Sequence, residues 1–335
     1  MTVEILILFV NLVLILVGAE IFTNGVEVFA KRFSLTQAVA GSILAAMGTA
    51  LPETILPLVA ILLHKGEAGH SIGVGAILGA PFMLSTLAFF LIGLTGFLSS
   101  ILKRREFSFD IEISTVKRDL IFFILMYSCG IFLPMVVEKA FIVVMLLIFG
   151  YVFYLYKTLK SSSKEIIQEE KLHFERFLER IPLISRFKSL LTSLQILIAV
   201  FVMIEGAQGF VKALQKLSES FNFDPLIFSL LVAPVATELP EKVNSIIWTL
   251  KGRDTLAIGN VTGAMVFQST FPVAIGILFT EWNIKGYALL SACLVLFISL
   301  IILGGTLLRR RVPPFLLIFS GVFYILYIMI VLVTL

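Results

Sequence analysis

Long apolar runs, separated by short polar segments, make up most of the chain. A transmembrane helix needs about 20 predominantly apolar residues to cross a bilayer. The pattern therefore predicts ten transmembrane helices, at residues 4–29, 36–63, 71–97, 119–136, 139–157, 191–213, 225–250, 255–280, 286–306 and 313–334. A charged segment, residues 159–190, separates the first five runs from the last five. It is typical of an amphipathic linker helix, which would be either a solvated connector or a regulatory element.

The two halves of the chain resemble each other. The block FSLTQAVAGSILAAMGTALPE at 33–53 aligns without a gap with FNFDPLIFSLLVAPVATELPE at 221–241, and both contain Thr-x-Leu-Pro-Glu. A second block, GAILGAPFMLST at 75–86, aligns with GNVTGAMVFQST at 259–270. An odd number of spans in each half places the two copies in opposite membrane orientations, as in many secondary transporters.

We therefore expect an all-α integral membrane protein whose ten transmembrane helices form two inverted five-helix repeats. The N-terminal repeat would comprise residues 1–158 and the C-terminal repeat residues 191–335, joined by the linker at 159–190.

Composition and charge agree with this class. The chain of 335 residues is 59% hydrophobic and only 14% charged, whereas soluble domains are about 25% charged. Most lysines and arginines fall in the loops expected on one side of the membrane, together with the linker, and such residues mark the cytoplasmic side. Both termini should therefore face outward across the plasma or inner membrane, with lipid as a partner. The basic residues that give the net charge of +4 lie at the ends of the expected helices, so this charge gives no indication of nucleic-acid binding. The sequence does not specify an oligomeric state.

The repeated proline and glutamate place oxygen atoms inside predicted spans. Proline lacks an N–H and clashes with the carbonyl four residues earlier, so Pro52 and Pro240 should interrupt their helices and free two backbone carbonyls. A charge near the bilayer centre costs at least about 2.5–3.5 kcal/mol, and a bound cation would offset that cost. Because hard cations prefer carboxylate, hydroxyl and carbonyl oxygens, we expect one cation site shared by the two halves. The residues expected to form it are Gly48, Thr49, Glu53, Ala236, Thr237, Glu238 and Glu241, with Glu53 and Glu241 as metal ligands.

A lysine near this site suggests an internal ion pair. Glu238 and Lys242 are four residues apart, which is the spacing for a pair on one helix. Two interpretations remain open. Lys242 could take the place of one bound monovalent ion, or it could snorkel or pair outside the site.

Other polar groups in the spans are secondary candidates. Glu20 and Glu205 are expected deep and buried in spans 1 and 6, where they would line an access path, carry protons, or pair with neighbours for packing. Further candidate ligands, with packing roles as the alternative, are Ser85, Asn260, Gln268 and Ser269.

The two blocks resemble the paired alpha-repeats of the cation/calcium exchanger superfamily. Its members carry Gly-Thr-Ser-Leu-Pro-Glu followed by Gly-Asn-x-x-Gly-Ser-Asn. Residues 48–53 match the first element well, and residues 236–241 match it less closely. The resemblance implies antiport of Ca²⁺ against Na⁺ or H⁺ through the shared site, with these small inorganic cations as transported ligands and no cofactor.

The second element departs from the family pattern. Residues 80–81 are Ala-Pro and residues 264–265 are Ala-Met, where the family has Ser-Asn. The first asparagine is kept as Asn260 but is Ala76 in the first half. Neither proline nor methionine can replace an amide oxygen.

Two alternatives to sodium/calcium exchange follow from these departures: a proton-coupled or other-cation antiporter, or a degenerate membrane protein that does not transport. An intramembrane enzyme is not expected, because the sequence has no His-Glu-x-x-His motif and no nucleophile next to a base. No nucleotide-binding loop is present either, so ion gradients rather than ATP should supply the energy.

Overall fold

The computed structural model describes residues 2–32, 50–64, 66–137, 140–161 and 188–334, and all regular elements in these ranges are helices. The first half contains α1 (Thr2–Arg32), α3 (Leu51–Leu62), α4 (Glu67–Met83), the π-helical turn η2 (Leu84–Ala88), α5 (Phe89–Ile101), α6 (Ile113–Phe132), the short 3₁₀ helix η3 (Leu133–Met135) and α7 (Ala140–Ser161). The second half contains α9 (Lys188–Ser220), α10 (Pro225–Leu250), α11 (Asp254–Gln268), α12 (Phe271–Phe279), α13 (Gly286–Arg309) and α14 (Pro314–Thr334).

Seven segments of the described chain are long and apolar enough to cross a membrane. They correspond to seven of the ten expected spans. The expected span at 36–63 is described only from residue 50 onward, as the short apolar helix α3. The expected spans at 119–136 and 225–250 fall on α6 and α10, and each of these helices carries three charged residues, which lowers its hydropathy. The described part is therefore an all-helical membrane protein.

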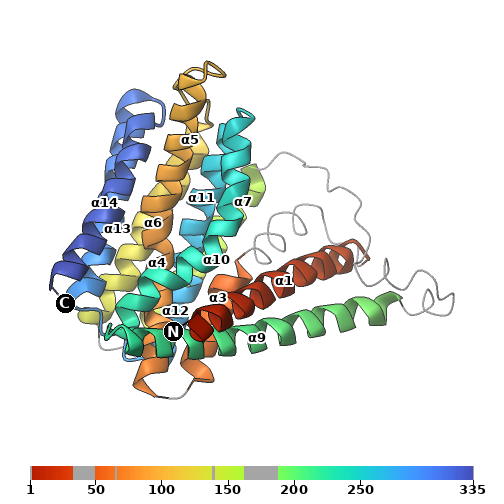
Figure 1. Ribbon diagram of the computed structural model, residues 1–335. Coiled ribbons are helices and arrows are strands. Elements are labelled where there is room, and N and C mark those ends of the chain that lie inside the picture. Colours follow the sequence, from red (N-terminus) through yellow and green to blue (C-terminus); the bar gives the residue numbers. More distant parts are fainter. Residues whose placement is uncertain (1, 33–49, 65, 138–139, 162–187, 335) are drawn as a thin grey trace.

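Helices α1 and α9 lie side by side at a steep angle to the other helices (Figure 1). They are antiparallel, because Gly18 meets Met203 whereas the earlier Asn11 meets the later Gly209. A Cβ atom at Gly18 would lie only 2.6 Å from a side-chain carbon of Met203. Small residues at such a contact let two transmembrane backbones approach closely.

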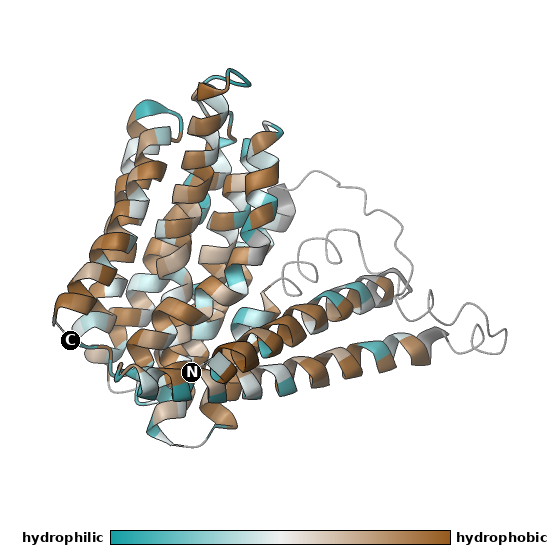
Figure 2. Cartoon of the chain, viewed as in Figure 1, coloured by the Kyte–Doolittle hydropathy of each residue, from teal (hydrophilic) through white to brown (hydrophobic). Residues whose placement is uncertain are grey.

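Hydrophobic residues run along the helices, and hydrophilic residues gather at several turns between them (Figure 2). The α5–α6 and α13–α14 turns lie at the upper end of the bundle in Figure 1, whereas both termini lie toward its lower end. The sequences of these two upper turns are rich in lysine and arginine.

Helices α4 and α10 pack in parallel through two glycines of the second repeated block. A Cβ atom at Gly75 would lie 2.2 Å from the carbonyl oxygen of Leu226, and one at Gly79 would lie 2.2 Å from that of Leu230. The backbones can be this close only because glycine has no Cβ. The Ser229 hydroxyl of α10 reinforces the contact by donating to the carbonyl of Ile72 in α4 at a distance of 2.7 Å.

The aligned Ser-Thr pairs of the second block lie at matching helix irregularities. Ser85 and Thr86 lie within the π-turn between α4 and α5, and Ser269 and Thr270 lie where α11 ends and α12 begins. The carbonyl of Thr86 accepts a hydrogen bond from the backbone N–H of Phe89 and another from the Ser320 hydroxyl of α14 at 2.8 Å. The π-turn is therefore in direct contact with α14.

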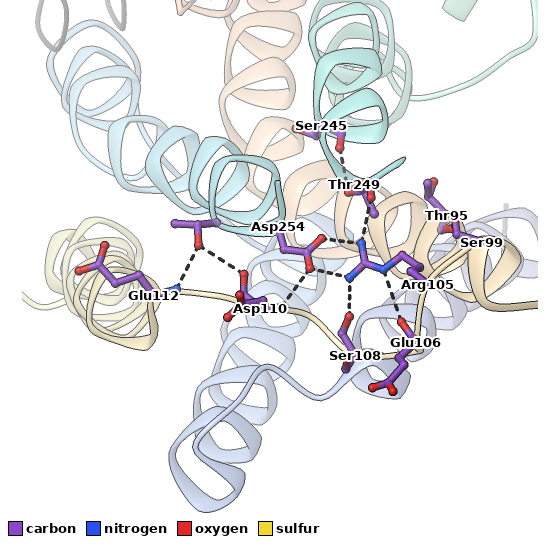
Figure 3. A network of polar contacts seen from close by, with 11 residues as sticks. Thr95, Ser99, Arg105, Glu106, Ser108, Asp110, Glu112, Ser245, Thr249 and Asp254 are labelled. Carbon is purple, nitrogen blue, oxygen red and sulfur yellow. Dashed lines mark hydrogen bonds and ion pairs between the residues drawn. The ribbon is translucent and has the colours of Figure 1, made fainter. Parts of the chain in front are cut away.

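The turn after α5 is fastened to the start of α11 by one arginine (Figure 3). Arg105 donates to both carboxylate oxygens of Asp254 at 2.7 and 2.6 Å, and also to the carbonyl of Thr249 at 2.9 Å. The backbone N–H of Asp110 donates to the same carboxylate at 3.0 Å. The hydrogen bond to Asp254 raises the pKa of Arg105 above its usual value. This Arg105–Asp254 pair connects segments far apart in the sequence.

Candidate cation-binding site

Glu53 is the third residue of α3 and is 5% exposed. Proline is favourable in the first turn of a helix, where its missing N–H costs nothing, so Pro52 suits this start. The unpaired N–H groups of a helix start carry partial positive charge, which stabilises a carboxylate there. The local sequence thus builds a helix start that holds a buried carboxylate.

Glu53 lines a pocket between α3, α4 and α10, and the empty volume of this pocket, including space open to solvent, is about 180 Å³. Thr237 lies in the same pocket, so the two halves of the chain meet there. The lining residues are Glu53, Leu56, Pro57, Ala76, Ala80, Ala233, Pro234 and Thr237. Among these described residues, Glu53 is the one carboxylate and Thr237 the one hydroxyl.

Two of the residues that depart from the family motif line this pocket. Ala76 and Ala80, which stand where the resembled family has Asn and Ser, both line it. Methyl groups therefore replace two oxygen-bearing side chains. The Thr237 hydroxyl donates to the carbonyl of Ala233 at 3.2 Å, and its oxygen lone pairs remain able to accept a cation.

A buried ion pair follows directly on α10. Nζ of Lys242 lies 3.1 Å from Oε2 of Glu238, and both side chains are 2% exposed. The other carboxylate oxygen accepts a hydrogen bond from Gln268 of α11 at 3.3 Å. The pair expected from the four-residue spacing is therefore present, and it brings Gln268 to the same carboxylate.

Several expected site residues lie outside the part of the chain that the structure describes. Gly48 and Thr49 fall within the undescribed segment 33–49, and the side chain of Glu241 is likewise outside the description. Their roles as ligands stay predictions. Ala236 is described and is partly buried in α10.

The structure corrects the expected interruption of the second helix. Helix α10 runs without a break from Pro225 to Leu250 through Pro240. A proline removes one hydrogen bond, but the turns before and after it keep this helix continuous.

The expected burial of two acidic residues is also wrong. Glu20 on α1 and Glu205 on α9 are both exposed. The hydrophobic periodicity of a single helix could not show their exposure, because exposure depends on the face that each helix turns toward its neighbours.

The secondary candidates make local contacts. The hydroxyls of Ser85 and Ser269 donate to carbonyls of their own helices, at 3.2 and 2.8 Å. Asn260 donates to the Ser245 hydroxyl of α10 at 3.0 Å, which joins α10 and α11. Their roles as cation ligands stay predictions.

Sequence reasoning missed two buried carboxylates, Asp254 of the Arg105–Asp254 pair and Asp119. Asp119 of α6 is 2% exposed and accepts hydrogen bonds from Thr262 of α11 at 2.8 Å and from Tyr154 of α7 at 3.0 Å. Arg118 lies 3.0 Å from the same carboxylate. The signal available in the sequence for Asp119 was its position, as an ionisable residue, at the edge of the predicted span 119–136. The cluster fixes α11, which carries Gln268, against α6 and α7.

Comparisons with known proteins place this architecture. The family model described as sodium/calcium exchanger protein matches residues 3–159 and 192–335. The putative antiporter CaxA of Alkalimonas amylolytica is 23% identical over 331 residues, which are 97% of this chain and 98% of CaxA.

Two solved structures show a similar fold. The H⁺/Ca²⁺ exchanger CAX has a TM-score of 0.71 at 17% identity, with 97% of this chain and 82% of that one covered. The sodium-calcium exchanger NCX_Mj has a TM-score of 0.59 at 19% identity, with 98% and 99% covered. Since the family model matches nearly all of both halves, this chain belongs to the sodium/calcium exchanger protein family.

Proposed function

We propose that this protein is a secondary active antiporter that exchanges Ca²⁺ for Na⁺ by alternating access to the pocket that contains Glu53. The observation that carries the proposal is a buried carboxylate in a pocket walled by both halves of the chain. A carboxylate at this depth is costly unless a cation offsets its charge. Family membership and the names of the similar proteins CaxA, CAX and NCX_Mj support transport rather than catalysis. The transported cations are the only ligands that we propose.

We also propose the ten-helix, inverted-repeat topology with both termini outside and the linker in the cytoplasm. The antiparallel α1–α9 pair supports it, because inverted copies of a first helix must run in opposite directions. The parallel α4–α10 pair supports it as well, because spans 3 and 7 run the same way through the membrane. The basic turns at one end of the bundle and the termini toward the other agree with a cytoplasmic upper end.

Transport is tested with purified protein in proteoliposomes. Uptake of ⁴⁵Ca²⁺ is measured under an outward Na⁺ gradient and, separately, under an outward H⁺ gradient. We expect Glu53→Gln to lower the driven uptake about tenfold or more, which corresponds to about 1.4 kcal/mol or more of lost interaction. Glu67→Gln is the matched control, because Glu67 also lies in the first turn of a helix but is exposed.

The gradients separate the candidate functions. Uptake driven by H⁺ but not Na⁺ would indicate the proton-coupled alternative, which the loss of oxygen ligands at Ala76 and Ala80 favours. Absence of uptake under both gradients, together with no rise in melting temperature on adding Ca²⁺ or Na⁺, would refute transport and indicate a degenerate member. A ligand that binds only the folded state must raise that temperature.

A further inference from the structure

The ion pair of Glu238 and Lys242 lies at the middle of α10 and is almost fully buried. The distance of 3.1 Å between Nζ and Oε2 is that of a direct ion pair. Replacing such a pair by apolar residues often costs nothing or even stabilises a protein. Stability alone therefore does not explain why two charges lie here.

The first half of the chain has a neutral version of the same pair. The gap-free alignment of the repeated block pairs Glu238 with Ala50, and continuing it by one residue pairs Lys242 with Thr54. The Thr54 hydroxyl donates to the carbonyl of Ala50 at 2.8 Å, so a hydrogen bond closes the same helical turn without any charge. The charges are thus a feature of one repeat only, and the fold of this turn does not require them.

The pair also lies next to the candidate site. Thr237, the residue before Glu238, lines the pocket that contains Glu53. The carboxylate of Glu238 has one oxygen near the ammonium of Lys242 and the other near the amide of Gln268. An ammonium group and a monovalent metal ion carry the same charge, and either can neutralise this carboxylate.

We propose that the Lys242 ammonium is a tethered cation, which neutralises Glu238 and lowers by one the number of monovalent cations that the site binds in each transport cycle. The inference rests on the proposed antiport function and specifies its stoichiometry. Each repeat would contribute differently, because the first half carries no such built-in charge. Removing the ammonium should therefore create a binding place for one additional Na⁺.

Lys242→Thr tests this by copying the residue of the first repeat. Na⁺-driven ⁴⁵Ca²⁺ uptake in proteoliposomes is measured at one fixed alkaline pH, with choline replacing Na⁺. We expect the Hill coefficient for Na⁺ to rise by about one relative to wild type, and the addition of Glu238→Ala to return it to the wild-type value. Lys216→Thr is the matched control, because it removes a lysine that is paired with Glu4 on the surface.

A second readout needs no transport. The rise in melting temperature between choline and Na⁺ buffers should be larger for Lys242→Thr than for wild type, because Na⁺ would now stabilise Glu238. Lys242→Gln is measured in the same way if the threonine variant does not fold, since its longer side chain can still reach Glu238. Equal Na⁺ dependence of wild type and a folded Lys242 variant, in both readouts, would overturn the tethered-cation inference. Absence of any Ca²⁺ flux in wild type would instead overturn the proposed function.

Discussion

The Arg105–Asp254 pair allows a sharp test of how the two halves are held together at one end of the bundle. The change is Asp254→Asn, which keeps the size of the side chain but removes its charge. In the wild type, the carboxylate is 1% exposed and receives two N–H groups of Arg105 and the backbone N–H of Asp110. In the variant, the amide would direct its own N–H groups toward a guanidinium that can only donate.

The expected loss follows from this geometry. Breaking a buried, hydrogen-bonded ion pair by removing one partner costs about 3–5 kcal/mol. Unfolding entropy of about 2.1 cal/mol/K per residue gives about 0.7 kcal/mol/K for a chain of 335 residues. The melting temperature should therefore fall by about 4–7 °C, because the free-energy loss is divided by the unfolding entropy.

The assay is thermal unfolding of the purified protein in detergent, followed by intrinsic fluorescence. Asp110→Asn is the matched control, since it removes the same charge from the turn that Asp254 contacts. The side chain of Asp110 is exposed, and Asp110 contributes only through its backbone to the network in Figure 3. Such a surface change should cost less than about 0.5 kcal/mol. Equal melting temperatures for Asp254→Asn and Asp110→Asn would refute the reasoning.

Two further changes test packing and polar satisfaction. Gly79→Ala would place a Cβ atom 2.2 Å from the backbone oxygen of Leu230. Overpacking of this kind costs about 1–3 kcal/mol of stability, so both the melting temperature and Ca²⁺ uptake should fall. Gly304→Ala, which has no described atom within 4 Å, should leave both unchanged or slightly improved, and similar losses in the two variants would contradict the packing argument. Thr262→Val removes a buried donor to Asp119 and should cost about 1–3 kcal/mol, measured as a lower melting temperature; an unchanged value would show that the cluster does not hold α11.

The sequence by itself determined the class of the protein and identified Glu53 as the carboxylate of the candidate cation site. Apolar runs of membrane-spanning length can be read locally, because the bilayer imposes one length and one polarity on any segment that crosses it. The duplicated Thr-x-Leu-Pro-Glu element singled out Glu53, because a proline and a carboxylate within an apolar run are costly without a function. The spacing of Glu238 and Lys242 predicted their ion pair, because residues four apart lie on the same face of a helix.

Only the tertiary structure decided which residues meet across the bundle. It placed Ala76 and Ala80 against Glu53 and Thr237, and it gave Asp119 its partners on two other helices. These contacts join positions many residues apart in the chain. They depend on how closely glycine-bearing faces approach and on how each helix is rotated about its axis. Periodicity along one segment carries no information on that rotation relative to a distant partner, which is why burial was expected wrongly for Glu20 and Glu205.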